Sequence, residues 1–511
     1  MSDFETDFMS DVPRGDTAQF LRQQSAPESI WMPLADIKRS AALQYDPMKP
    51  GKKILIGALG HQLIGIEDDR HIMTVAGSRS GKSVGLISNM LFYRGSILAT
   101  DPKGELARLT AKRRSAMGQR ILVLDPFGVV DQAAAGWRAS YNPMDVLDIH
   151  GPTFLEDAAL IAGSMVVQSA DQKDPHWDES ARNFIEGVIV HVATATAYVG
   201  KRHLVSVRGL LKQALKKTPA SADDRPSAGT QPALYVEMLE NAARLQAQAD
   251  TEDIGEALAG AAEDFYSKRE NELSGVLSTV NRHTKFLDYR AFRGVMQRSD
   301  FSLRDLKRNP SGVSLYLCFP ATRADISRRW MRLFINQLLD AMEREQTVPE
   351  APVLVCLDEF PVLGYMQQLE TAAGLIASYG VKLWFVLQDF NQGKALYKER
   401  WETFVGNAGI LQFFGNSDLT TTKYISERLG KTPVKVARMG EVAQEQQKKG
   451  LSGRSESVEM YDLLTPGEVS RQFARSDRLH RQLVHWVDYH PMMLQRVIYH
   501  DKNGPLAPFL I

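Results

Sequence analysis

A short segment, residues 76–83, has the composition and spacing of a loop that binds nucleotide phosphates. It follows an expected strand at residues 72–75 and precedes an apolar helix expected over residues 84–92. In such a turn, backbone N–H groups and the helix N-terminus face one anion, a lysine reaches the β and γ phosphates, and a serine binds Mg²⁺. The usual first glycine is Ala76 here. The candidate nucleotide-binding residues are Gly77, Ser78, Arg79, Ser80, Gly81, Lys82 and Ser83.

Two carboxylates stand at the end of a second apolar run, residues 352–357. Asp358 is placed to bind Mg²⁺ through water, and Glu359 to polarise the water that attacks the terminal phosphate. An aspartate after a strand is common, but here the same chain also carries a phosphate-binding loop. The two motifs together predict Mg²⁺-dependent hydrolysis of a nucleoside triphosphate, with Ser83 and Asp358 as the metal-binding candidates.

Gln388 follows a third apolar run, residues 383–387. In a doubly wound sheet, the carboxyl ends of the parallel strands converge on the nucleotide crevice. Gln388 is therefore a candidate sensor of the γ phosphate, and it joins Lys82 and Glu359 as a catalytic candidate. The alternative is that Gln388 only caps the helix that follows.

Short apolar runs rich in branched residues alternate with longer amphipathic stretches from residue 54 onward. This pattern is typical of an α/β fold with a mostly parallel sheet covered by helices. One expected helix carries an apolar stripe over residues 326–342, with Arg328, Arg329 and Arg332 off the stripe, which predicts one buried face and one basic face. The expected strands are residues 72–75, 96–100, 120–124, 313–319, 353–357, 383–387 and 410–414.

Residues 151–290 interrupt this alternation, because they show only helical periodicity. We expect an inserted all-α domain there, and a nucleotide-binding domain made of residues 51–150 and 291–511. Residues 1–50 are expected to be an N-terminal arm, mobile over residues 1–30, and a lead-in. The polar segments 218–232 and 440–457 predict an exposed break and a surface loop.

The composition is that of an ordinary globular protein of 511 residues, with 44% apolar and 24% charged residues. The 61 basic and 61 acidic residues cancel, so any contact with nucleic acid must use local patches. Cys318 and Cys356 lie in apolar runs, which indicates reduced core thiols in a cytoplasmic protein. We expect neither a membrane span nor an export signal, because no apolar run is long enough and the N-terminus is acidic.

Further motifs make the sequence resemble a known family. In this order, and around one helical insertion, the motifs are similar to the signatures of TraG/TraD-type coupling proteins of type IV secretion and conjugation. The resemblance runs from residue 55 to residue 500. The motifs are Asp101-Pro-Lys-Gly-Glu105, Leu124-Asp-Pro-Phe127, Tyr141-Asn-Pro143, Leu357-Asp-Glu-Phe-Pro-Val-Leu-Gly364, Gln388-Asp389 and residues 421–430.

This resemblance implies a RecA-like P-loop ATPase domain with an inserted all-α domain, related to the FtsK and HerA motors. It implies ATP and Mg²⁺ as cofactors and assembly into a hexameric ring. The implied partners are type IV secretion channel components and a relaxase–DNA complex or effector proteins, so DNA is an expected ligand. The family's site positions correspond to Lys82, Ser83, Asp358, Glu359 and Gln388.

Two departures from the family pattern change these expectations. Coupling proteins usually begin with two membrane-spanning helices, and none is expected here, so the protein would be cytoplasmic and reach the inner membrane only through a partner. Many members also have an arginine, serving the neighbouring subunit's nucleotide, at the position of Ala377, eleven residues before Gln388. The nearest cation in sequence is Lys382, which would begin a strand.

Other charged residues allow more than one interpretation. His176 lies near acidic residues, but no second His or Cys stands at a ligand spacing, which favours packing at a helix N-terminus over a metal site. Basic clusters within residues 112–114 and 201–217 are either solvated helix faces or a surface for DNA or protein. Two alternative functions remain, a soluble DNA translocase that serves no channel and a non-hydrolysing docking module. An intact Glu359 argues against the docking module.

Overall fold

A computed structural model describes residues 30–166, 176–216, 231–439 and 454–510 of the chain. In these residues one sheet of 11 strands has the order β2-β1-β13-β12-β9-β3-β8-β7-β4-β6-β5, and a second sheet has two strands. The strands from β9 to β5 in this order are parallel, whereas β2, β1, β13 and β12 are joined by antiparallel pairs. The expected α/β architecture with a mostly parallel sheet is confirmed.

All of the expected strands lie in the parallel part of the sheet, and their observed ends differ from the expected ends by at most two residues. Every residue of the central strands β7, β8 and β9 is buried, because helices cover both faces. The parallel strands are β3 (His71–Ala76), β4 (Ile97–Thr100), β5 (Arg120–Leu124), β6 (Val313–Leu317), β7 (Val353–Leu357), β8 (Val381–Leu387) and β9 (Ala408–Phe414).

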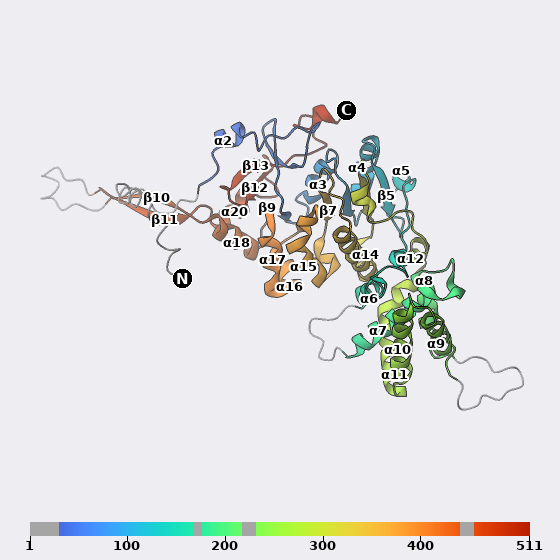
Figure 1. Cartoon of the computed structure of the whole chain (residues 1–511). Coiled ribbons are helices and arrows are strands. Elements are labelled where there is room, and N and C mark those ends of the chain that lie inside the picture. The colour runs from blue at the N-terminus through green and yellow to red at the C-terminus, as the bar shows by residue number, and fades with distance from the viewer. Residues whose placement is uncertain (1–29, 167–175, 217–230, 440–453, 511) are drawn as a thin grey trace, which may run out of the picture.

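The sequence pattern does not predict four of the strands in the large sheet. They extend the sheet beyond β9, so that segments from near both ends of the described chain lie side by side (Figure 1). Ala58 of β1, for example, pairs with Gln495 of β13. The strands are β1 (Ile54–Leu59), β2 (Gln62–Ile66), β12 (Arg481–Trp486) and β13 (Met492–Gln495).

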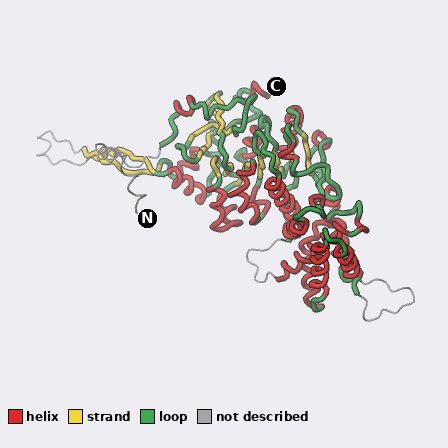
Figure 2. Tube along the Cα trace, viewed as in Figure 1, coloured by secondary structure: helices red, strands yellow, loops and turns green. Residues whose placement is uncertain are grey.

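The second sheet is a hairpin of β10 (Lys431–Met439) and β11 (Arg454–Asp462), which projects from the body (Figures 1 and 2). The prediction of a surface loop over residues 440–457 is therefore wrong for residues 454–457, which belong to β11. The polar composition predicts a loop, but a projecting ribbon buries neither face and so needs no apolar alternation. Residues 440–453 lie outside the described residues, as do residues 218–230 of the expected break and residues 1–29 of the expected arm.

Helices gather at one end of the molecule (Figure 1). Within the described parts of residues 151–290 the regular elements are helices, as the periodicity predicts. Phe184 and Phe265 stack in their core with ring centroids 3.5 Å apart. The helices are α6 (Phe154–Met165), α7 (His176–Thr194), α8 (Leu204–Leu211), α9 (Ala233–Gln246), α10 (Glu252–Tyr266) and α11 (Glu270–Thr284), followed by α12 (Arg290–Val295).

The long helix α14 (Ala324–Arg344) joins these helices to the sheet. Asn336 of α14 donates a hydrogen bond to Ser164 Oγ of α6 at 2.8 Å, and Arg344 pairs with Asp157 of α6 at 2.6 Å. One hydrophobic core therefore runs from one face of the sheet into the helical part.

The expected apolar stripe of α14 is confirmed, since Trp330, Phe334, Leu338 and Met342 are buried. The expectation of a basic face is wrong for Arg332, which is only 7% exposed and donates a hydrogen bond to the carbonyl oxygen of Tyr365. The period of a helix places a residue on a face, but it cannot show that a neighbouring loop covers that face.

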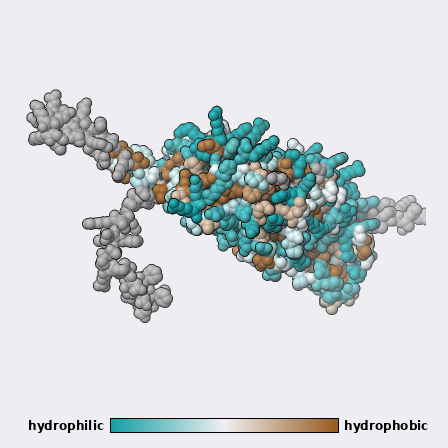
Figure 3. Space-filling model, turned by 90° about the horizontal axis from the view of Figure 1, so that it is seen from above, coloured by the Kyte–Doolittle hydropathy of each residue, from teal (hydrophilic) through white to brown (hydrophobic). Residues whose placement is uncertain are grey.

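The two cysteines, Cys318 and Cys356, are buried free thiols, as their apolar surroundings predict. On the face shown in Figure 3, hydrophilic residues cover most of the body and hydrophobic residues form small patches between them. In the part of the chain that the structure describes, no helix combines the length and the apolar character needed to cross a bilayer.

Candidate functional site

The turn between β3 and α3 (Lys82–Met90) has the geometry of a phosphate cradle. Gly77 has no room for a side chain, because a Cβ there would lie 2.0 Å from the carbonyl oxygen of Gly415. Gly81 has a φ of +90°, which favours glycine. Ala76 is the last residue of β3 and pairs with Phe414, so the position of the usual first glycine is ordinary extended strand. Helix α3 begins two residues earlier than expected, so Lys82 and Ser83 lie in its first turn, where backbone N–H groups lack helical partners.

The carboxylate of Asp358 faces this turn from the end of β7. Its Oδ2 atom lies 3.4 Å from Ser83 Oγ, and its backbone carbonyl accepts a hydrogen bond from Thr100 Oγ1 at 2.8 Å. Burial and the nearby charge of Glu359 raise the pKa of Asp358 to about 6, although Lys82 acts in the opposite direction. A buried carboxylate beside a serine hydroxyl is a donor set that suits Mg²⁺, which prefers oxygen ligands and keeps several waters.

Glu359 lies beside both the lysine and the glutamine that the sequence singles out. Lys82 Nζ is 3.7 Å from Glu359 Oε1, and Gln388 Nε2 is 3.2 Å from the same oxygen. The Glu359 side chain is 31% exposed, so water can reach it. Its φ of +58° is unusual for a residue other than glycine, and such strain occurs often at functional sites.

The strand order explains why Gln388 reaches this point. Strand β8 lies between β3 and β7, so the residue after β8 stands between the phosphate cradle and the two carboxylates. The side chain of Gln388 does not cap the following helix, α16 (Phe390–Tyr397). Asp389 caps this helix instead, because its side chain accepts a hydrogen bond from the N–H of Gln392. The structure therefore brings Lys82, Ser83, Asp358, Glu359 and Gln388 together.

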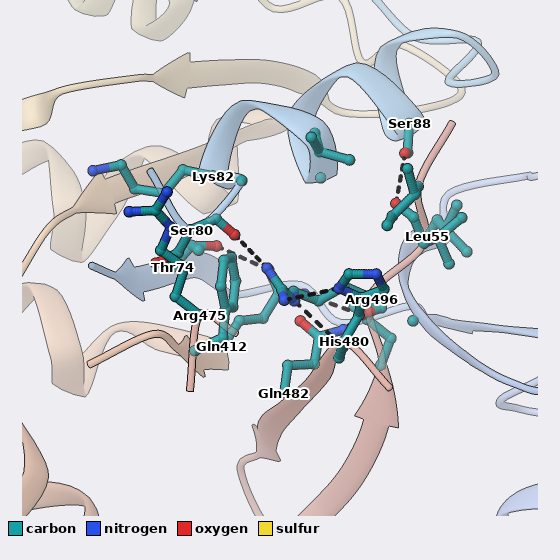
Figure 4. A pocket seen from close by; sticks show the side chains of 18 of the residues that line it. Leu55, Thr74, Ser80, Lys82, Ser88, Gln412, Arg475, His480, Gln482 and Arg496 are labelled. Atoms are coloured by element: carbon teal, nitrogen blue, oxygen red, sulfur yellow. Dashed lines mark hydrogen bonds between the residues drawn. The ribbon is translucent and has the colours of Figure 1, made fainter. Parts of the chain in front are cut away.

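A cavity opens on the other side of the cradle, toward β1, β12 and β13 (Figure 4). Arg496, which follows β13, donates a hydrogen bond to the carbonyl oxygen of Ser80 and lies over the ring of Phe414, 4.7 Å from its centroid. Arg475 and His480 also line the cavity. No motif marks these residues in the sequence, because the antiparallel strands bring them to the cradle from more than 390 residues away.

Lys382 cannot serve as the missing cation of the site. It is 2% exposed, and its Nζ donates a hydrogen bond to the carbonyl oxygen of Asp68, at the amino end of β8. The cradle lies at the opposite, carboxyl end of the strands. Burial lowers the pKa of Lys382 to about 8. Lys382 lies at the start of β8, as expected, but it is buried there and is not available to a nucleotide. Ala377 lies in a short 3₁₀ helix, Ile376–Tyr379.

The basic clusters are solvated only in part. Arg114 is fully buried and donates hydrogen bonds to the carbonyl oxygens of Met90, Tyr93 and Gly95, so it closes the core. Arg208 is 6% exposed and pairs with Asp288 at 2.7 Å. These two arginines are not available to a nucleic acid. His176 is the first residue of α7, and its Nε2 lies 3.2 Å from Glu272 Oε1.

Comparison with known proteins identifies the family to which the chain is similar. The model of the family described as "Type IV secretory system Conjugative DNA transfer" matches residues 31–509. Conjugal transfer protein TraG of Escherichia coli is 26% identical over 377 residues, which cover 71% of this chain and 55% of TraG. Protein VirD4 of Agrobacterium fabrum is 25% identical over 365 residues, 70% of this chain and 49% of VirD4. The chain thus spans about half the length of the curated relatives it matches.

Solved structures share the fold over nearly the whole chain. The bacterial conjugative coupling protein TrwBdeltaN70, in its unbound monoclinic form, aligns with a TM-score of 0.62 and 15% identity over 93% of this chain and 95% of its own. TrwB in complex with ADP and Mg²⁺ aligns with a TM-score of 0.60 and 15% identity, covering 93% of this chain and 96% of its own. This likeness confirms the expected RecA-like P-loop fold.

Proposed function

Since the chain belongs to the type IV secretory system conjugative DNA transfer family, we propose that it binds and hydrolyses ATP with Mg²⁺ and so moves DNA, or protein attached to it, to a type IV secretion channel. The observation that carries this proposal is the convergence on one sheet edge of Lys82, Ser83, Asp358, Glu359 and Gln388. TrwB has been solved with non-hydrolysable analogues of ATP and of GTP and with ADP and Mg²⁺, which supports a nucleoside triphosphate and Mg²⁺ as the ligands.

Each side chain has a distinct task in this proposal. Lys82 and the backbone N–H groups of residues 77–83 would hold the phosphates. Ser83 and Asp358 would hold Mg²⁺, which would supply positive charge beside the β and γ phosphates. Glu359 accepts the proton of the attacking water, and Gln388 holds the Glu359 carboxylate in position. Charge that develops on the γ phosphate is stabilised by donors that are already in place, so little reorganisation is needed.

The cavity beside the cradle is the proposed site of the nucleoside. It is lined by Gly81, Val84 and Gly85 at the start of α3, where the α phosphate and sugar leave a phosphate cradle. Apolar residues such as Leu55, Val497 and Ile498 offer a surface for the faces of a base. Arg496 also lines this cavity and donates a hydrogen bond to the carbonyl oxygen of Ser80 in the cradle.

The assembly and partners that we propose are those that the family resemblance implies. We place the ATP sites between subunits of a hexameric ring, and we assign residues 151–290 to contacts with a relaxase–DNA complex or effector proteins. The nucleotide-binding part then consists of residues 51–150 and 291–511, after a lead-in over residues 1–50. Contact with the inner membrane would run through channel components. The family description supports DNA and a type IV secretion system as the partners.

Affinity purification from native cells tests the transport role. Wild-type protein and Glu359→Gln are tagged, cross-linked and recovered, and the bound protein and nucleic acid are identified. We expect both to recover channel components, and Glu359→Gln to retain more substrate because its cycle stops with ATP bound. Recovery of DNA without any channel component would contradict service to a channel, while leaving ATP hydrolysis untouched.

A further inference from the structure

Four arginines come together where the helical part meets α14. They are Arg282 of α11 and Arg328, Arg329 and Arg332 of α14, and we call them the arginine cluster. Burial and the neighbouring guanidinium groups of Arg282 and Arg328 lower the pKa of Arg329. Burial, together with Arg328 and Arg329, also lowers the pKa of Arg332, although Tyr397 acts in the opposite direction. Like charges therefore repel one another at this place.

Acidic side chains lie beside only two of the four arginines of the cluster. Asp178 accepts from Arg282 at 2.8 Å, and Asp325, which is almost fully exposed, lies 3.5 Å from Arg328. Within the described part of the chain, no carboxylate lies within 4 Å of Arg329 or Arg332. The Nε atoms of both are buried without a hydrogen-bond partner. A charged donor without a partner is costly, and the side chain of Arg329 is partly exposed, so Arg329 has the chemistry of a site for an anion.

The cluster also holds the turn that carries Glu359. Arg328 Nε donates a hydrogen bond to the carbonyl oxygen of Val362 at 3.1 Å, and Arg332 donates one to that of Tyr365. The N–H of Val362 in turn donates to the carbonyl oxygen of Glu359 at 2.9 Å. Gly364, between Val362 and Tyr365 in the sequence, has a φ of +71°, and a Cβ there would lie 3.2 Å from Arg328 Cδ. The two arginines therefore fix this turn to α14.

We propose that the arginine cluster binds phosphates of a nucleic-acid backbone and that this contact sets the position of Glu359. Arginine is suited to phosphate because its planar guanidinium donates two parallel hydrogen bonds. Arg328 and Arg329, which are partly exposed, and Arg282, which is exposed on another helix, can contact more than one phosphate, which a single small anion cannot satisfy. Arg332 is buried and acts only through its hydrogen bond to Tyr365. The chain has no net charge, so nucleic acid needs a local patch of this kind.

The proposal rests on the proposed function, but DNA binding at the cluster is measured without ATP and the link to Glu359 with it, so the two can fail separately. Binding of fluorescent single-stranded DNA to the full chain is measured by anisotropy at several salt concentrations, without ATP. For Arg329→Gln we expect about tenfold weaker binding and a slope of log affinity against log salt reduced by about 1. Arg329→Lys should keep most of the slope, and Arg428→Gln, an exposed arginine on α18 (Leu419–Leu429), should match the wild type.

A second measurement tests the coupling. The ratio of ATP turnover with DNA to turnover without DNA should fall toward one in Arg328→Gln, whereas Arg428→Gln should keep the wild-type ratio. Unchanged affinity and salt slope in Arg329→Gln would overturn the binding site. Arg329-dependent binding of inorganic tripolyphosphate without binding of DNA would overturn the nucleic-acid assignment. A ratio that stays at the wild-type value in Arg328→Gln would overturn the link to Glu359.

Discussion

Gln388 and Glu359 are hydrogen-bonded partners from neighbouring strands, with Gln388 Nε2 3.2 Å from one carboxylate oxygen of Glu359 and 3.3 Å from the other. The amide donates to both oxygens and so restrains the direction in which the carboxylate faces. Lys82 Nζ approaches the same carboxylate from the cradle at 3.7 Å. Glu359 is thus held between the residue that would bind the phosphates and the residue that would sense them.

Replacing Gln388 by alanine should slow hydrolysis without preventing nucleotide binding. The carboxylate would lose its orienting donor, and misplacement of a reacting group by about 1 Å can cost on the order of 10²-fold in rate. The check is single-turnover hydrolysis beside the affinity for a non-hydrolysable ATP analogue. Gln368→Ala, at an exposed position of α15 (Gln367–Leu375), is the control. A Gln388→Ala enzyme with wild-type turnover would show that the contact has no catalytic role.

Lys82→Ala should weaken nucleotide binding itself. A hydrogen bond to a charged group contributes about 1.5–3 kcal/mol, so affinity for the ATP analogue should fall roughly tenfold to a hundredfold. Calorimetric titration measures this loss. Lys112→Ala removes an exposed lysine from α4 (Glu105–Ala116) and should bind as the wild type does. Equal affinity of the two variants would place the phosphates away from residues 77–83.

Asp68 should make the stability of the fold depend on pH. Burial alone would raise the pKa of Asp68, but hydrogen bonds from Arg70 and Trp486 outweigh burial and hold the pKa at about 2. This pKa is lower in the folded chain than in the unfolded chain, near 3.9, so the stabilisation is complete above about pH 4 and is lost as the pH falls toward 2.

Asp68→Asn should therefore destabilise the protein by about 2 kcal/mol at pH 7, and by less at pH 3. Urea unfolding followed by tryptophan fluorescence at several pH values gives the difference. Asp36→Asn, at an exposed position of α2 (Leu34–Arg39), should change little at any pH. A difference between Asp68→Asn and wild type that grows toward acid pH would contradict the assigned ionic contact.

The parallel strands are predictable because each is an apolar run buried on both faces, which leaves a strong local signal. The antiparallel strands β12 and β13 are not, since Arg481, Gln482 and His485 interrupt an already short run, and their pairing with β9 and β1 depends on contacts far apart in sequence. The site is likewise predictable only in part. Lys82 and Glu359 belong to motifs, but Arg496 reaches Ser80 only through the folded sheet.

Turnover should depend on assembly. Lys382 is buried at the far end of β8 and residue 377 is alanine, so neither supplies the cation that ring ATPases place on a neighbour's γ phosphate. We expect low turnover per subunit in dilute protein and a rise with protein concentration or with added DNA. Fast hydrolysis that is independent of concentration, by a species that sediments as a monomer, would rule out a shared site.

The most direct test of the account is ATP turnover by Glu359→Gln, measured beside its affinity for ATP, because this change removes the proposed base and keeps its size. The account predicts that ATP and Mg²⁺ still bind while turnover falls by about 10²-fold or more. Glu399→Gln, an exposed glutamate of the short helix Lys398–Trp401, should hydrolyse ATP as the wild type does. Equal turnover in Glu359→Gln and wild type would contradict the assignment of Glu359 and with it the proposed mechanism.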